Sequence, residues 1–102
     1  MDLPESLQII SSTYRLVVSD PGGLPDGWGG YCDYETKVIK VVSGLHPQRT
    51  REVVLHEILH AIHFEMGLED DGTEEEFTDR TARGLLAMAQ TGPFLRELLN
   101  LC

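Results

Sequence analysis

Three polar residues interrupt an apolar segment of the chain, His56, Glu57 and His60 in the run HEILH. The two histidines are four residues apart, and residues at this spacing lie on one face of an α-helix. Their imidazole nitrogens can therefore be directed at one point, which indicates a metal site. Zinc suits this pair, because it binds neutral imidazole at about 2.0–2.1 Å and tolerates an open coordination position for water.

Glu57 follows the first of these histidines directly. A bound cation lowers the pKa of its water towards roughly 7, so a neighbouring carboxylate can take the proton of that water. We therefore predict that Glu57 is a general base and not a ligand. The alternative is a chance spacing of two histidines on a packing helix. A buried ionisable side chain costs on the order of several kcal/mol unless it is paired or metal-bound, which disfavours that alternative.

A third protein ligand is expected from the acidic cluster Glu74, Glu75 and Glu76, which begins a second helical segment. We predict Glu75 as this ligand. Glu76 has a competing role, because it is placed to complete a capping box with Thr73. The alternative for all three carboxylates is compensation of the helix dipole in a first helical turn.

Asp79 lies one helical turn after Glu75, and Ala82 and Leu86 continue the same face. Asp79 is therefore predicted to accept a hydrogen bond from the far nitrogen of a metal-bound histidine. An ion pair with Arg83 is the alternative for this carboxylate.

Three further residues are candidates for contacting a substrate or stabilising an oxyanion: His63, Tyr31 and Tyr34. Nothing in the sequence selects one of them. For His63, which follows His60 by three residues, the alternative is an interaction with the end of the helix.

Hydrophobic spacing predicts the elements that position these residues. A helix is expected from Gln48 to Met66, ended by Gly67, and a second from Thr73 to about Gln90. In the second helix an apolar stripe is expected at Phe77, Thr81, Leu85 and Met88, and residues 93–100 predict a short final helix.

The segment before these helices predicts strands. Residues 9–18 are rich in β-branched residues and predict one strand. Residues 31–42 predict a hairpin centred on Glu35 and Thr36. The segment that joins residue 18 to residue 31 is rich in glycine and proline and predicts a loop. The chain is therefore predicted to be one α+β domain over residues 1–102. A small sheet of about three strands would pack on the histidine-bearing helix, and the second helix would close the site.

Composition excludes several classes of function. A net charge of −9 argues against direct binding of nucleic acid, because such a surface repels phosphate. No apolar run approaches the roughly 20 residues that span a bilayer, and the first residues lack the features of a signal peptide. With Cys32 and Cys102 far apart and expected to be reduced thiols, we predict a cytoplasmic protein without a membrane partner.

The segments LHEILHAIHFEMGL and EEFTDRTARGLLAM resemble small phage and prophage metallopeptidases related to the ImmA/IrrE branch of the HExxH zinc peptidases, the zincins. In that branch a second helix supplies the third ligand, and its signature falls in register with Glu75, Asp79, Ala82, Leu85 and Leu86. Two positions depart from the signature: Thr81 replaces the usual aromatic residue, and Ala87 and Met88 stand where it ends in proline.

The resemblance implies one zinc ion, hydrolysis of peptide bonds and a peptide or protein substrate. Residues 30–42 are also similar to the hairpin that precedes the active-site helix in the phage members, where an edge strand implies a place for extended substrate. Larger members act on transcriptional repressors and carry DNA-binding modules, and this role does not transfer to a chain without such a module.

Two other functions stay open. A zinc-stabilised module that binds a peptide without cutting it needs a fourth protein ligand, such as Cys32 or His63. An adaptor that mimics nucleic acid is the other, and the charge of −9 motivates it. Glu57 favours an enzyme over the binding module, since a purely structural site needs no base.

Overall fold

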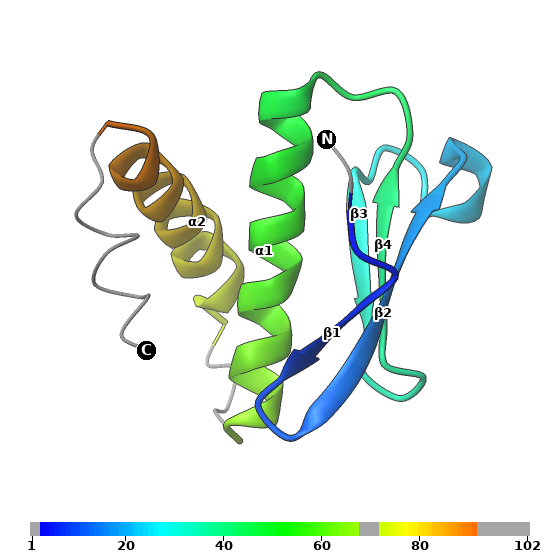
Figure 1. The fold of residues 1–102 in the computed structure, drawn as a ribbon, viewed down its shortest axis with the longest axis horizontal. Helices are drawn as coiled ribbons and strands as arrows, with labels where there is room; N and C mark the ends of the chain where they lie inside the picture. Colours follow the sequence, from blue (N-terminus) through cyan, green and yellow to red (C-terminus); the bar gives the residue numbers. More distant parts are fainter. Residues whose placement is uncertain (1–2, 68–71, 92–102) are drawn as a thin grey trace.

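Helix α1 lies between a four-stranded sheet on one side and helix α2 on the other, so the protein has three layers (Figure 1). The computed structural model describes residues 3–67 and 72–91. The elements are β1 (Ser6–Ile9), β2 (Ser12–Ser19), a short 3-10 helix (Pro21–Gly23), β3 (Gly30–Asp33), β4 (Val38–Val42), α1 (Pro47–Glu65) and α2 (Glu74–Thr91). The predicted α+β class is confirmed. None of the described helices has the length and apolar character that crossing a membrane requires.

The strand order is β1-β2-β4-β3, with β2 and β4 parallel and the other two pairs antiparallel. The chain leaves β2, forms β3 at the edge of the sheet and returns as β4 between them. Strand β3 therefore pairs with β4 on one side only within the described residues. Helix α1, which carries the histidines, contacts β3, β4 and β1, so the edge strand β3 lies beside this helix.

The sheet has four strands, so the prediction of about three was low by one. The strand predicted over residues 9–18 corresponds to β2 from Ser12 onward. Strand β1, which ends at Ile9, was not predicted, and the chain turns between the two strands at Ile10 and Ser11. Ile10 has a φ of 57°, a left-handed conformation that is uncommon for a β-branched residue. The turn carries no Gly or Asn, so the sequence shows no hairpin signal there.

The hairpin predicted over residues 31–42 is confirmed as β3 and β4. Its turn is held by Asp33, whose Oδ1 accepts hydrogen bonds from the backbone N–H groups of Glu35 and Thr36 at 3.0 and 3.2 Å. Tyr34 lies in this turn and not in a strand.

The long helix predicted up to Met66 is confirmed, and the structure begins it at Pro47. Pro47 fits the first turn because the N–H that it lacks would have no partner within the helix. At the other end Gly67 adopts a φ of 72°, and its N–H donates to the carbonyl of Phe64 at 3.0 Å.

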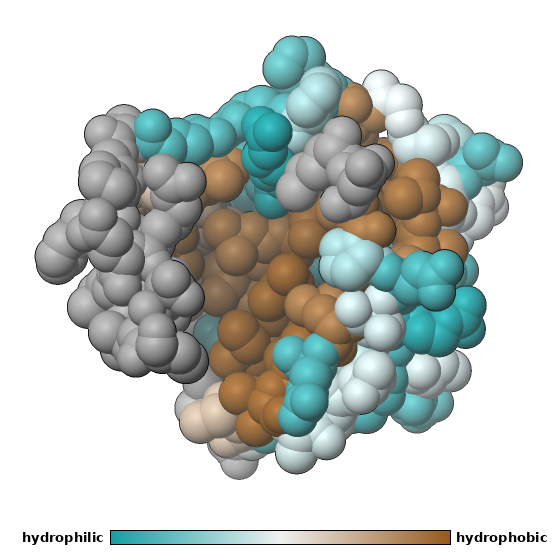
Figure 2. All heavy atoms as spheres, in the orientation of Figure 1, coloured by the Kyte–Doolittle hydropathy of each residue, from teal (hydrophilic) through white to brown (hydrophobic). Residues whose placement is uncertain are grey.

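The main core forms where α1 crosses the sheet. Its buried members are Ile9, Tyr14, Ile39, Val41, Val53, Val54 and Ala61. Apolar residues also gather in the middle of the face that Figure 2 shows, over α1, with polar residues around them. The helix that carries the histidines is therefore held along its length by apolar contacts.

The buried face of α2 differs from the predicted stripe. Phe77 and Met88 of that stripe are exposed, Phe77 to 59%, whereas Thr78 and Ala82 are fully buried. Small side chains at these two positions let α2 approach α1 closely. Glu76, the predicted capping-box partner of Thr73, has its carboxylate 2.6 Å from the Arg80 guanidinium. The final helix predicted for residues 93–100 lies outside the described residues.

The last turn of α1 is fastened to the sheet by the carboxylate of Glu65. This carboxylate accepts hydrogen bonds from the hydroxyls of Ser12 and Tyr14 at 2.7 and 2.8 Å, and from the ammonium of Lys37 at 2.7 Å. The Glu65 side chain is only 8% exposed. The hydrogen bond from Lys37, followed by those from the two hydroxyls, lowers the pKa of Glu65 to about 2.

We predict that Glu65→Gln lowers the melting temperature at pH 7 and weakens the pH dependence of stability in acid. A carboxylate with an ordinary unfolded pKa of about 4.3 and a folded pKa of about 2 stabilises the fold above the first value, and this contribution is lost as pH falls through the second. Thermal unfolding at pH 7 measures the melting temperature, and urea unfolding between pH 7 and pH 2 measures the free energy of unfolding, both followed by circular dichroism. Glu35→Gln, at an exposed turn position, is the control. Equal acid sensitivity of Glu65→Gln and wild type would contradict the role of Glu65.

Candidate metal centre

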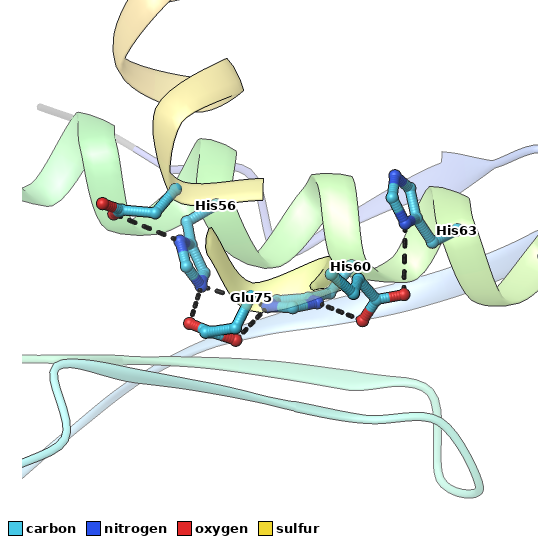
Figure 3. Close-up of polar contacts among 6 residues, drawn as sticks. His56, His60, His63 and Glu75 are labelled. Carbon is cyan, nitrogen blue, oxygen red and sulfur yellow. Dashed lines mark hydrogen bonds and ion pairs between the residues drawn. The ribbon is translucent and has the colours of Figure 1, made fainter. Parts of the chain in front are cut away.

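His56 and His60 project from the middle of α1 towards the first turn of α2 (Figure 3). Their Nε2 atoms are 3.1 Å apart, and their rings meet edge to face at a centroid distance of 4.7 Å. Both side chains are largely buried. The spacing of four residues has therefore placed the two imidazoles as the helix geometry predicts.

Glu75 completes a cluster with the two histidines. Its Oε1 lies 2.8 Å from Nε2 of His56, and its Oε2 lies 2.8 Å from Nε2 of His60 (Figure 3). The Glu75 side chain is 75% exposed, so it reaches the histidines from the solvent side. The structure thus brings together the three residues that the sequence predicts as ligands.

The geometry of this cluster fits a small cation. One donor atom from each residue lies within 4.8 Å of the others. Ligands at about 2.0–2.1 Å from a tetrahedral ion are separated by roughly 3.3 Å. Contacts of 2.8 and 3.1 Å are therefore within a few tenths of an ångström of what an ion would require. His56, His60 and Glu75 could hold a metal ion, and the geometry alone does not select which metal.

The number of hydrogens that the imidazoles can donate also favours a cation here. His60 faces a carboxylate oxygen at both ring nitrogens, Glu74 at 2.9 Å and Glu75 at 2.8 Å. A neutral imidazole has one N–H, so the other nitrogen opposes a carboxylate lone pair with its own lone pair. If both Nε2 atoms instead carried hydrogens for Glu75, the two N–H groups would face each other across 3.1 Å. One metal ion among the three donors removes both conflicts.

Glu57 is buried on a different side of α1 from the histidine cluster. Its Oε2 lies near β3, where a Cβ added to Gly30 would come within 3.0 Å of it and within 2.6 Å of Val53. Only glycine allows this close approach of the strand, a requirement that the sequence did not reveal. Burial raises the pKa of the Glu57 carboxyl to about 7, while His60 acts to lower it and Glu75 to raise it.

Asp79 lies between its two predicted partners. Its Oδ1 is 3.7 Å from Nδ1 of His56, which is longer than a hydrogen bond, and its Oδ2 is 3.3 Å from the guanidinium of Arg83. Asp79 is therefore near the ligand without holding it.

Glu74, the carboxylate next to the predicted ligand Glu75 in the acidic cluster, contacts two histidines. Its Oε2 lies 2.9 Å from Nδ1 of His60, and its Oε1 lies 3.1 Å from Nδ1 of His63. The spacing of the histidines could have predicted this contact, because His60 and His63 share a helix face and one carboxylate can bridge them. His63 therefore lies behind His60, outside the donor cluster.

One pocket of about 680 Å³ contains the cluster and Glu57. Helix α1 lines it from Arg49 to His60, and Trp28 to Cys32 with Tyr34 line the opposite side. Tyr31 and Tyr34 thus lie where the sequence predicts substrate contacts, and Tyr34 stacks on Phe64 with ring centroids 4.5 Å apart. Neither Cys32 nor His63 belongs to the donor group found in residues 3–67 and 72–91.

Comparisons with known proteins do not place the chain in a family: no family model matches it, and no curated protein and no solved structure matches it.

We predict that Glu75→Gln lowers the affinity for zinc at least about 10-fold, because the amide replaces a charged ligand. Glu76→Gln, which removes the same charge one residue away, should change it by less than about threefold, since Glu76 pairs with Arg80. Competition with a chromophoric chelator measures both affinities. A larger loss in Glu76→Gln than in Glu75→Gln would move the ligand by one residue.

Proposed function

We propose that this chain is a zinc-dependent peptidase in which His56, His60 and Glu75 hold one zinc ion and Glu57 is the general base. The observation that carries the proposal is the presence, in one pocket, of a three-donor cluster and a separate buried carboxylate. Three protein donors leave a fourth position for water, whereas a structural zinc site closes with four. The resemblance of HEILH and the Glu75 helix to phage zinc peptidases of the ImmA/IrrE type supports the same proposal.

The chemistry divides between the ion and the chain. When bound, zinc lowers the pKa of a coordinated water and polarises the scissile carbonyl. Glu57 accepts the proton of the attacking water as the new carbon–oxygen bond forms, and it returns the proton to the leaving amine as the carbon–nitrogen bond breaks. Its place between α1 and β3 puts this carboxylate against the wall along which a peptide would run.

The shape of the pocket suits an extended peptide. The part of α1 that lines it runs from Arg49 to His60, eleven residues further along the helix, which is roughly 16 Å at 1.5 Å per residue. An extended chain covers this length with about five residues. The opposite wall is β3, and the carbonyl of Gly29, directly before this strand, accepts a hydrogen bond from the N–H of Val42 at 2.8 Å. By the alternation of antiparallel pairs, the backbone groups of Gly30 and Cys32 then face the outer edge, which no strand covers among residues 3–67 and 72–91 and where a substrate strand can pair.

The end of the pocket near the start of α1 offers an aromatic surface. Trp28 is 53% exposed and lies against Tyr31 with ring centroids 6.0 Å apart. We place an apolar side chain of the substrate here, because an exposed indole and phenol supply a large contact area at little conformational cost.

The thiol of Cys32 is unpaired, and burial raises its pKa to about 12. A reduced thiol suits the reducing cytoplasm, which is the proposed compartment.

The function is tested with Glu57→Gln. This variant should keep zinc and fold but lose at least about 100-fold in kcat/KM, because the amide preserves the shape and cannot accept the proton. Cleavage is followed by mass spectrometry on a library of unstructured peptides, with His56→Ala as the control that loses metal and activity together. Activity of Glu57→Gln within a few-fold of wild type would reject the base. A wild-type protein that binds zinc and peptides but cleaves none would be a binding module.

We also predict that Trp28→Ala raises KM about 3- to 10-fold at nearly constant kcat, the loss expected for one aromatic contact. Trp28 is the only tryptophan, so its fluorescence reports peptide binding directly in the inactive Glu57→Gln protein. Val18→Ala, at a residue that is exposed and does not line the pocket, is the control. An unchanged KM together with unchanged fluorescence on adding substrate would place the peptide elsewhere.

A further inference from the structure

We propose that Glu74 is a positioning residue of the metal centre, which fixes His60 so that its Nε2 lone pair is presented to the ion. This inference rests on the proposed metal site. It assigns adjacent carboxylates in the first turn of α2 to different tasks, Glu75 to the ion and Glu74 to the back of a ligand.

The hydrogen bonds of Glu74 determine which nitrogen of His60 carries the hydrogen. Each of its oxygens lies within hydrogen-bond distance of one Nδ1, that of His60 at 2.9 Å and that of His63 at 3.1 Å. An ionised carboxylate only accepts, so both Nδ1 atoms must donate. Neutral His60 then has its lone pair at Nε2, the atom that lies 2.8 Å from Glu75 and 3.1 Å from Nε2 of His56.

The contact between Glu74 and the two histidines is largely buried, which strengthens its hydrogen bonds. The Glu74 side chain is 16% exposed, in contrast to the 75% of Glu75, and the His60 and His63 side chains are also largely buried. A hydrogen bond from an imidazole to a carboxylate is stronger when water does not compete for either partner. His63 adds a second donor, which stops the Glu74 carboxylate from rotating away from His60.

The two histidine ligands are therefore held unequally. Nδ1 of His56 is 3.7 Å from Asp79, and that carboxylate also pairs with Arg83. Nδ1 of His60 has a short bond to a buried carboxylate. We expect metal affinity to depend more on Glu74 than on Asp79, the reverse of what the sequence predicts.

A merely structural role for Glu74 would be to fasten α2 to α1 or to compensate the helix dipole. Both roles would change the free energy of unfolding without selecting a tautomer of His60. The ring ¹⁵N chemical shifts of metal-free protein at pH 8 separate the cases, because they distinguish a hydrogen on Nδ1 from one on Nε2.

The experiment compares zinc affinity and His60 tautomer in wild type, Glu74→Ala, Glu76→Ala and Asp79→Asn. Glu76→Ala is the matched control, since it removes the same charge from the same helical turn at an exposed side chain. We expect Glu74→Ala to lower zinc affinity about 10- to 100-fold and to mix the tautomers, with a smaller loss in Asp79→Asn and none beyond threefold in Glu76→Ala. If Glu74→Ala does not fold, Glu74→Gln replaces it, which keeps one accepting oxygen and should disturb either His60 or His63.

Several outcomes would overturn the inference. Wild-type His60 with its hydrogen on Nε2 would do so, as would equal zinc affinities in Glu74→Ala and Glu76→Ala. In either case zinc binding and Glu57-dependent cleavage by the wild type would leave the proposed function standing. If instead the wild type binds no zinc, the proposed function fails, and the inference fails with it even where the metal-free spectra show the His60–Glu74 bond.

Discussion

The contact between the carboxylates at the start of α2 and the histidines in the middle of α1 is the interaction on which the site depends. It brings Glu74 and Glu75 against opposite nitrogens of His60. A cation would stabilise this contact, since neutral imidazoles cannot donate to every carboxylate oxygen they face. The two helices approach closely because Thr78 and Ala82 are small and buried. A cation at the cluster would therefore join α2 to α1 as well as serve chemistry, as expected when metal binding adds to folding free energy.

The position of α1 on the sheet is set by separate contacts at separate points along the helix. Glu65 ties its last turn to β2 and Lys37 through one carboxylate. About a third of the way along, Val53 packs where Gly30 leaves no Cβ in the way, which fixes how near β3 comes to Glu57. Because none of these contacts involves α2, we infer that the distance from Glu57 to β3 is set by α1 and the sheet.

Features that follow from local periodicity could be predicted from the sequence. The spacing of His56 and His60 fixes their common direction within one helix, and Glu75 followed from the face that it shares with Ala82. Features set by contacts between distant segments could not be predicted. The parallel pairing of β2 with β4, the turn at Ile10 and the close approach at Gly30 leave no pattern in neighbouring residues. In α2 several stripes fit a period of 3.6, and the large apolar residues pointed to the wrong one.

A ligand and a base can be neighbours in the chain because adjacent helical residues point about 100° apart. His56 faces α2, and Glu57 faces β3, so the layered arrangement separates the two functions that HEILH combines. The space that both can reach is the pocket between α1 and β3, near its border with the first turn of α2. A peptide lying along β3 would have both Glu57 and the histidines within the pocket that it occupies. The edge position of β3 in the sheet is thus what links the fold to the proposed chemistry, since an inner strand would have no free backbone groups to hold a substrate there.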